Sequence, residues 1–173
     1  MIPLIVILTI SIKATGKGPV IYSQKRVGRC GKPFVIYKFR SMHFGMEEEV
    51  PLLSDKEDKR ITVLGRFMRK HKFDEIPNLI NVLKGEMSII GPRPEQQFYI
   101  DQIVQIEPRY KQLQLNKPGI TSWGQVKYGY ASNVDEMIKR LKYDLFYLEN
   151  RSFWFDMKIA FYTIAIIFKG QGI

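Results

Sequence analysis

Two adjacent carboxylates, Asp74 and Glu75, follow a basic run and precede an arginine, Arg93, that lies between two prolines in GPRP. An aspartate can act as a nucleophile on phosphorus, and an adjacent glutamate can help to hold magnesium, which prefers oxygen ligands and shares them with substrate phosphates. The flanking prolines restrict the backbone, which suits a guanidinium that grips a phosphate with two parallel hydrogen bonds. These residue types are therefore candidates for chemistry on a phosphorylated substrate.

Each of these features also has a structural interpretation. Acidic residues at the start of a helix cap free amide groups and complement the helix dipole. A loop of prolines and glycine often carries an arginine that points at solvent. Basic Lys38 and Arg40 alternate with aromatic neighbours, which is also typical of a half-buried strand. The residues alone leave both interpretations open.

Positive charge is unevenly distributed along the 173 residues. The chain has 27 Lys and Arg residues against 17 Asp and Glu residues, which gives a formal net charge of +10. Residues 1–46 contain no acidic side chain, residues 47–58 are acidic, and basic residues return directly before Asp74. Such an excess indicates an anionic partner, which is a nucleic acid, a membrane surface or a phosphorylated substrate.

The sequence lacks the motifs of disulfide-bonded, zinc-binding, nucleotide-binding and nucleic-acid-binding proteins. Cys30 is the only cysteine, so an internal disulfide is excluded, and neither His43 nor His71 has a zinc-ligand spacing to it. The sequence contains no glycine-rich P-loop, no GxGxxG motif and no recognisable nucleic-acid-binding module. Because basic charge alone is a weak signal, no nucleic-acid partner is expected.

The hydrophobic pattern predicts a mainly helical α+β domain. VIYSQKRVG and KPFVIYKFRSM are rich in β-branched and aromatic residues and predict two strands joined by a glycine turn. Apolar residues at helical spacing predict helices over residues 60–72, 74–85, 97–115, 134–150 and 153–168. Asp74 is the predicted N-cap of the second helix, and residues 44–59 fit an exposed loop.

The chain opens with MIPLIVILTISI, which is uncharged and mostly apolar. As a helix this stretch is roughly 18 Å long, too short to span about 30 Å of bilayer hydrocarbon. It predicts either a buried core element or a segment that dips into one leaflet, with the basic residues behind it on anionic head groups. The apolar helix predicted over residues 153–168 leaves the same choice between core and interface.

Three stretches of the chain resemble, in the right order, the signatures of the bacterial sugar transferases. These stretches are KRVG…GKPFVIYKFRSM, DKRITVLGRFMRKHKFDEIPNLINVLKGEMSIIGPRPE and NKPGITSWGQV. The family comprises the monotopic polyprenol-phosphate phosphoglycosyl transferases, which initiate exopolysaccharide, O-antigen (lipopolysaccharide) and capsule-type glycan synthesis. The resemblance covers nearly the whole chain, and the order of the motifs makes it specific.

The resemblance implies an enzyme that transfers a sugar-1-phosphate in two steps. Asp74 would attack the sugar-bearing phosphorus of a UDP-sugar and release UMP, and undecaprenyl phosphate would then take the phosphosugar from the aspartate. Mg²⁺ would be held by Asp74 and chiefly by Glu75, which together form the dyad. Lys38, Arg69 and Arg93 match the positions that neutralise the diphosphate and the acceptor phosphate.

Further positions follow from the same resemblance. Three residues are expected to shape the loop that carries Arg93: Gly91, Pro92 and Pro94. Three more are expected on the sugar or nucleotide side of the site: Trp123, Gln125 and Asp144. The stretch from WGQV to ENRS looks more like the members that transfer a hexose-1-phosphate, so a UDP-hexose donor is expected.

The resemblance also implies a monotopic domain on the cytoplasmic face of the bacterial inner membrane, bound to the inner leaflet through amphipathic interfacial helices. Residues 1–13 would be the remainder of a re-entrant segment, and residues 14–173 the catalytic domain. Pro3 matches the proline of the family's Ser-Pro break, but Ile2 replaces the serine and only two residues precede Pro3. We therefore expect a chain that is truncated, has a misassigned start or is the catalytic part of a longer protein. The sequence leaves the oligomeric state open and is compatible with a homo-oligomer.

One alternative from another class stays open. A non-catalytic module that binds the membrane surface or polyprenyl phosphate would need the positive face but would not need Asp74. The intact dyad, together with Arg69 and Arg93, argues against this alternative.

Overall fold

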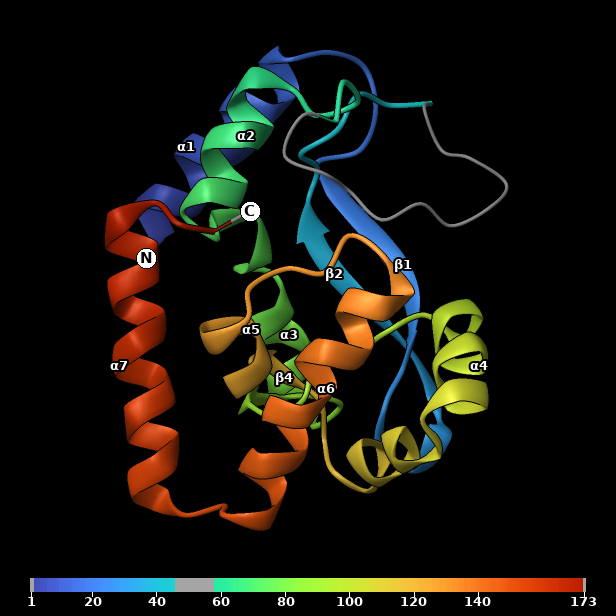
Figure 1. Cartoon of the computed structure of the whole chain (residues 1–173). Coiled ribbons are helices and arrows are strands. Elements are labelled where there is room, and N and C mark those ends of the chain that lie inside the picture. The colour runs from blue at the N-terminus through green and yellow to red at the C-terminus, as the bar shows by residue number, and fades with distance from the viewer. Residues whose placement is uncertain (1, 46–57, 173) are drawn as a thin grey trace.

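The computed structural model describes residues 2–45 and 58–172, so most of the loop predicted over residues 44–59 lies outside the described residues (Figure 1). The helices are α1 (Ile2–Ala14), α2 (Val63–Lys70), α3 (Asn78–Leu83), α4 (Gln97–Ile106), α5 (Trp123–Lys127), α6 (Val134–Glu149) and α7 (Phe153–Lys169). The strands are β1 (Ile21–Val27), β2 (Pro33–Phe39), β3 (Ser88–Ile90) and β4 (Gly119–Thr121). The 3₁₀ segments are η1 (Arg29–Gly31), η2 (Phe73–Glu75) and η3 (Pro108–Leu115).

The predicted mainly helical α+β architecture is confirmed. β1 and β2 form the predicted antiparallel hairpin, with Ile21 opposite Phe39, and the chain turns between them through η1. The helical stretch predicted over residues 97–115 divides into α4 and η3 at Pro108, which has no amide hydrogen to continue the helix.

A second, parallel pair of strands positions the loop after β3. In this pair Ser88 lies opposite Gly119 and Ile90 opposite Thr121. The amide of Gly91 donates to Thr121 at 3.1 Å, and the amide of Gly119 donates to Pro92 at 2.9 Å. The predicted loop residues Gly91 and Pro92 are thus fixed by backbone hydrogen bonds immediately before Arg93.

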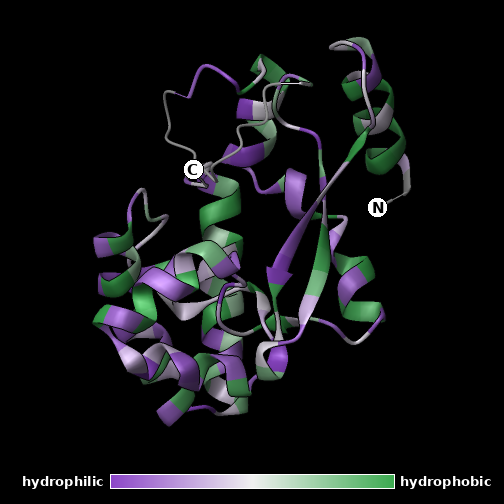
Figure 2. Ribbon diagram, turned by 90° about the vertical axis from the view of Figure 1, so that its right-hand side faces the viewer, coloured by the Kyte–Doolittle hydropathy of each residue, from purple (hydrophilic) through white to green (hydrophobic). Residues whose placement is uncertain are grey.

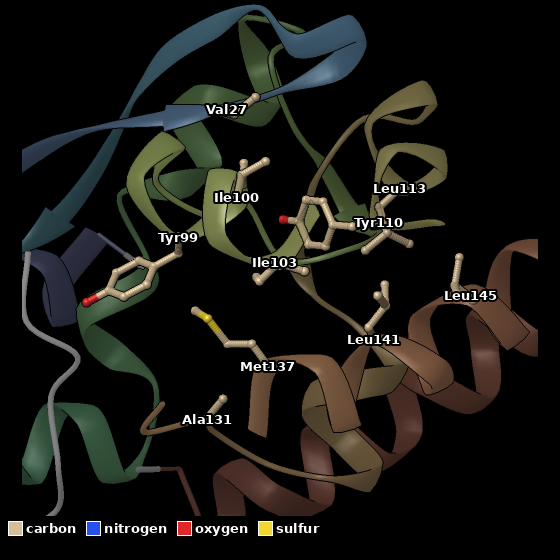
Figure 3. Close-up of a cluster of buried hydrophobic side chains, with 10 residues drawn as sticks. All are labelled: Val27, Tyr99, Ile100, Ile103, Tyr110, Leu113, Ala131, Met137, Leu141 and Leu145. Atoms are coloured by element: carbon tan, nitrogen blue, oxygen red, sulfur yellow. The ribbon is translucent and has the colours of Figure 1, made fainter. Parts of the chain in front are cut away.

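The main hydrophobic core joins β1, α4, η3 and α6 (Figure 3). Its buried members are Val27, Tyr99, Ile100, Ile103, Tyr110, Leu113, Ala131, Met137, Leu141 and Leu145. Because this core binds one end of the hairpin to the α4–α6 region, it gives the site a rigid base.

The N-terminal helix α1 packs on one side and is exposed on the other. Leu8 and Ile12 form a buried cluster with Phe39 of β2 and Met68 of α2. The guanidinium of Arg40 donates to the carbonyl oxygen of Ile12 in α1 and to those of Gly16 and Lys17 after it, at 2.9–3.0 Å, and so ties the end of this helix to the residue that follows β2. The remaining surface of α1 is predominantly hydrophobic (Figure 2).

Helix α7 lies along one side of the molecule and ends beside α2 (Figure 1). Ile159 packs with Tyr147 and Trp123 in a third buried cluster. At the far end, the amide of Gly172 donates to Lys70 at 3.0 Å, which ties the end of the chain to α2. Among the described residues, no helix has both the length and the apolar character needed to cross a bilayer. Insertion of residues 1–13 into a leaflet stays a prediction.

Replacing Gly65 by alanine tests the close approach of α2 to the chain after β2. A Cβ at this position would overlap the backbone carbonyl of Ser41, which also accepts from the amide of Thr62 at 3.0 Å. Although Gly→Ala in a helix usually stabilises by up to about 1 kcal/mol, this overlap should reverse the sign and cost about 1–3 kcal/mol. Urea denaturation measures the change.

The exposed Val63 on the same helix provides the control, since Val63→Ala should alter stability by no more than about 0.5 kcal/mol. A Gly65→Ala protein as stable as the parent would contradict the close approach.

Candidate active site

The dyad lies in a short 3₁₀ turn, η2, and points into the protein. Asp74 is 7% exposed and Glu75 is 4% exposed. The turn follows Lys72, whose left-handed backbone (φ 54°) redirects the chain after α2. Helix α3 then begins at Asn78, after Pro77, without a side-chain cap.

The prediction that Asp74 is an N-cap is therefore wrong. A capping carboxylate accepts from amides of its own helix, whereas Asp74 precedes the first residue of α3 by an additional turn. Pro77, directly before α3, has no amide hydrogen to donate. Both carboxylates are buried and lie near cations of other elements. The structural interpretation of these carboxylates as caps of free helix amides is thus excluded.

Glu75 is bound by two cations that the sequence placed far apart. Lys38 of β2 donates to Oε1 of Glu75 at 2.7 Å, and Arg93 of the loop after β3 approaches the same oxygen at 3.4 Å. The second oxygen of Glu75, Oε2, is buried without a hydrogen-bond partner among the described residues, as is Oδ1 of Asn78. The site thus has carboxylate and amide oxygens with unused acceptor capacity.

Arg69 completes the set of predicted cations. Its Nε donates to Ser41 at 2.8 Å, while its Nη1 is buried and has no partner in the described part of the chain. Burial lowers the pKa of Arg69, and the negative charge of nearby Asp74 acts in the opposite direction. The structure therefore brings Lys38, Arg69 and Arg93 together around the dyad. Their role in binding phosphate groups stays a prediction.

The two carboxyl groups differ in acidity. Burial and the negative charge of Glu75 raise the pKa of Asp74, against the attraction of Lys38. Burial acts in the same direction on Glu75, but Lys38, Arg93 and Lys72 outweigh it and hold the pKa of Glu75 well below its usual range. Glu75 is therefore the firmly ionised member of the pair.

Arg93 also lies near a second buried carboxylate, Glu95, which the sequence analysis did not identify. Glu95 accepts from Arg140 of α6 at 2.6 Å and from Arg26 of β1 at 3.2 Å, and it lies 3.8 Å from Nε of Arg93. The sequence carried a signal for this network, because Arg140 lies on the same side of α6 as apolar Met137 and Leu141. Charge on a buried helix face requires a partner.

Two further residues at the site were also missed. The ring of Tyr130, in the loop between α5 and α6, faces the guanidinium of Arg93 at 5.0 Å and the ammonium of Lys72 at 5.6 Å. The position of Lys72 directly before the dyad was a usable signal, whereas nothing in the local pattern around Tyr130 indicated its place.

The residues expected on the sugar or nucleotide side lie in the packing of α5 against α6 and α7. Trp123 packs edge-on against Phe155, and Asp144 accepts from the amide of Gly124 at 2.8 Å. The side-chain amide of Gln125 is buried, with neither polar atom paired within the described residues. Hydrogen bonds and ring contacts of the described residues do not link these three to the dyad, so their role stays a prediction.

The family model described as bacterial sugar transferase matches residues 1–170. This chain belongs to the bacterial sugar transferase family.

Individual relatives of this sugar transferase carry more specific names. A UDP-N-acetylgalactosamine-undecaprenyl-phosphate N-acetylgalactosaminephosphotransferase of Aeromonas hydrophila is 41% identical over 98% of this chain and 40% of its own length. A UDP-glucose:undecaprenyl-phosphate glucose-1-phosphate transferase of Escherichia coli K12 is 39% identical over 97% of this chain and 36% of its own length. The chain therefore spans about two fifths of these two relatives. The sugar transferase EpsL of Bacillus subtilis 168 is 37% identical, over 98% of this chain and 80% of its own length.

Replacing Glu95 by glutamine tests the anchor of the arginine loop. The charges of Arg140, Arg26 and Arg93 outweigh burial and lower the pKa of Glu95 in the folded protein. Removing one partner of such a buried network should lower the free energy of unfolding by on the order of 3 kcal/mol near neutral pH. Urea denaturation at several pH values measures this loss.

The pH dependence gives the sign of the effect. Because the folded pKa is depressed, the stabilisation is present above the unfolded carboxyl pKa of about 4.3 and is lost as the pH falls below it. The difference between parent and Glu95→Gln should therefore shrink on acidification. Glu107→Gln, which breaks an exposed pair with Arg109, is the control and should show no comparable loss. A pH-independent difference would contradict the assignment.

Proposed function

We propose that this sugar transferase moves a sugar-1-phosphate from a UDP-sugar to undecaprenyl phosphate through a covalent intermediate on Asp74. One observation carries the proposal: a buried pair of carboxylates is surrounded by four cationic side chains that come from separate elements. These side chains are Lys38, Arg69, Lys72 and Arg93. A site with more cations than carboxylates suits an anionic diphosphate.

In the first step, a carboxylate oxygen of Asp74 attacks the sugar-bearing phosphorus of the donor. The bond between this phosphorus and the bridging oxygen breaks, and UMP leaves with the electron pair. In the second step, a phosphate oxygen of undecaprenyl phosphate attacks the same phosphorus and displaces the carboxylate. The products are undecaprenyl-diphosphate-sugar and regenerated Asp74.

The acidity of the dyad supports this division of roles. Glu75 holds a negative charge that is neutralised by Lys38 and Arg93, so it stays a fixed ionic element of the site. Within the described part of the chain no ion pair occupies the carboxylate of Asp74. The nearby cations Lys38, Arg69 and Arg93 would stabilise the charge that accumulates on the phosphoryl oxygens in the transition state.

The residues present fit magnesium. The buried oxygens Oε2 of Glu75 and Oδ1 of Asn78 have unused acceptor capacity, and magnesium takes one or two carboxylates together with substrate phosphates. Asp74 and chiefly Glu75 would hold the ion in our proposal. When bound, Mg²⁺ offsets the negative charge of the diphosphate.

The names of the relatives support the substrate classes. The relatives from Escherichia coli and Aeromonas hydrophila are named for UDP-sugar donors and for undecaprenyl phosphate as acceptor. We extend both classes to this chain and, from the resemblance of residues 123–152, propose a hexose donor that starts a surface glycan.

A lipid acceptor requires access to a membrane, and the surface formed by α1, α2 and α7 supports this. Large exposed hydrophobic side chains gather on these three helices, among them Ile10, Val63, Trp154 and Phe161. Exposed apolar surface of this extent is typical of a membrane or protein contact. We propose that it lies on the cytoplasmic leaflet, as a monotopic attachment.

The covalent mechanism predicts a mass adduct. After incubation with Mg²⁺ and a panel of UDP-sugars without lipid acceptor, intact-protein mass spectrometry should show a gain of one sugar phosphate. The adduct and the release of UMP should both be absent in Asp74→Asn, because an amide cannot donate the attacking oxygen anion.

Asp101→Asn, which changes an exposed aspartate of α4, is the matched control and should form the adduct as the parent does. UMP release by Asp74→Asn would rule out the covalent mechanism. Binding of undecaprenyl phosphate without UMP release from any donor would favour the non-catalytic binding module.

The membrane proposal predicts that charge on the apolar surface weakens vesicle binding. The double change Trp154→Asp and Phe161→Asp places two charges where we propose acyl chains, and co-flotation with phosphatidylglycerol vesicles should fall at least several-fold. Leu83→Asp, at an equally exposed position on α3, is the control and should float normally. Equal flotation of all three proteins would contradict the proposed surface.

A further inference from the structure

Tyr130 contacts two cations of the site at once. Its ring faces the guanidinium of Arg93 at 5.0 Å and the Nζ of Lys72 at 5.6 Å, distances at which the negative face of an aromatic ring attracts a positive charge. One aromatic side chain therefore bridges the arginine loop and the residue that precedes the dyad.

Such a bridge addresses a like-charge repulsion. The positive charge of Arg93 is among the causes that lower the pKa of Lys72, after burial, so the two cations repel each other. A carboxylate between them would remove the repulsion, but it would also neutralise the charge that a diphosphate needs. An aromatic face attracts both cations and adds no net charge, because burial and the charge of Glu75 raise the pKa of Tyr130 and keep its phenol neutral.

The backbone on both sides of the bridge is held in place. Lys72 adopts a left-handed conformation that is uncommon for a residue other than glycine. Next to Tyr130, Ala131 is part of the main core, and the amide of Ser132 donates to Glu136 at 2.7 Å. The ring and the ammonium thus meet through fixed chain segments.

We propose that Tyr130 is a positioning residue whose ring holds Arg93 and Lys72 side by side next to the dyad, with their charge available to the donor diphosphate. This inference rests on the proposed function, since it assigns the two cations to the diphosphate of the UDP-sugar. The aromatic face is the required property, and the hydroxyl is dispensable.

Replacement of Tyr130 by a graded aromatic series separates the ring's charge distribution from its shape. Phenylalanine and its mono-, di- and trifluorinated analogues, introduced by codon suppression, have similar size, whereas each fluorine weakens the negative ring face. Phenylalanine should keep kcat/KM within about 2-fold of the parent. The trifluorinated ring and Tyr130→Leu should lose roughly 5- to 30-fold, as expected from a cation–π attraction of about 1–2 kcal/mol.

The loss should appear stepwise with fluorination and mainly in the KM for the UDP-sugar. If the ring acted only through packing, all four rings would give the same kcat/KM, and only Tyr130→Leu would have a lower kcat/KM. The matched control is the same series at Tyr128, whose ring lies against Tyr143 instead of a cation of the site. Fluorination at this position should leave kcat/KM unchanged.

A second readout does not depend on turnover. Calorimetry of UDP binding to Asp74→Asn protein that carries the same series at position 130 should show affinity falling with each fluorine. A flat series in both measurements overturns the role of Tyr130 while leaving the proposed function intact. Failure of the parent protein to release UMP counts against the proposed function instead, and the UDP series then still decides the role of the ring.

Discussion

Two adjacent carboxylates can be buried side by side only where positive charge compensates for their lost hydration and mutual repulsion. Asp74 and Glu75 meet this condition through cations from β2, from α2 and from the loop after β3, at distances down to 2.7 Å. The constraint explains why segments distant in sequence must converge at η2. If one element moved away, an uncompensated charge would stay buried.

The rest of the fold keeps these cations in place. Backbone hydrogen bonds of the parallel pair β3–β4 hold the start of the arginine loop, and Glu95 ties its end to Arg26 of the hairpin and Arg140 of α6. The Glu95 anchor reaches the main core through β1 and α6, whereas Ile90 of β3 packs in the third buried cluster. The small sheets therefore serve to position charge, while the helices supply most of the buried surface.

Helix α2 joins the site to the apolar surface. Its Met68 is buried in the cluster with α1, its Arg69 reaches the dyad region, and its Val63 and Phe67 are exposed. A single short helix thus has one side among charges and another side on the surface that we propose contacts lipid. This arrangement would let the phosphate of undecaprenyl phosphate approach the dyad while its polyprenyl chain stays in the membrane.

Local pattern was sufficient for the hairpin, for helices α2, α4, α6 and α7 and for the mainly helical class, because hydrophobic periodicity and turn residues act over a few neighbours. It did not predict the short helix α5. The motifs also identified the dyad and three of its cations through resemblance to a family. Local pattern did not predict contacts between residues that are distant in sequence. The N-cap prediction for Asp74 followed local rules, but the buried cations of other elements determined its place, and the contacts of Lys72, Glu95 and Tyr130 exist only after the chain has folded. Electrostatic compensation and ring–cation contact act through space, so their partners become known only when the tertiary structure brings them together.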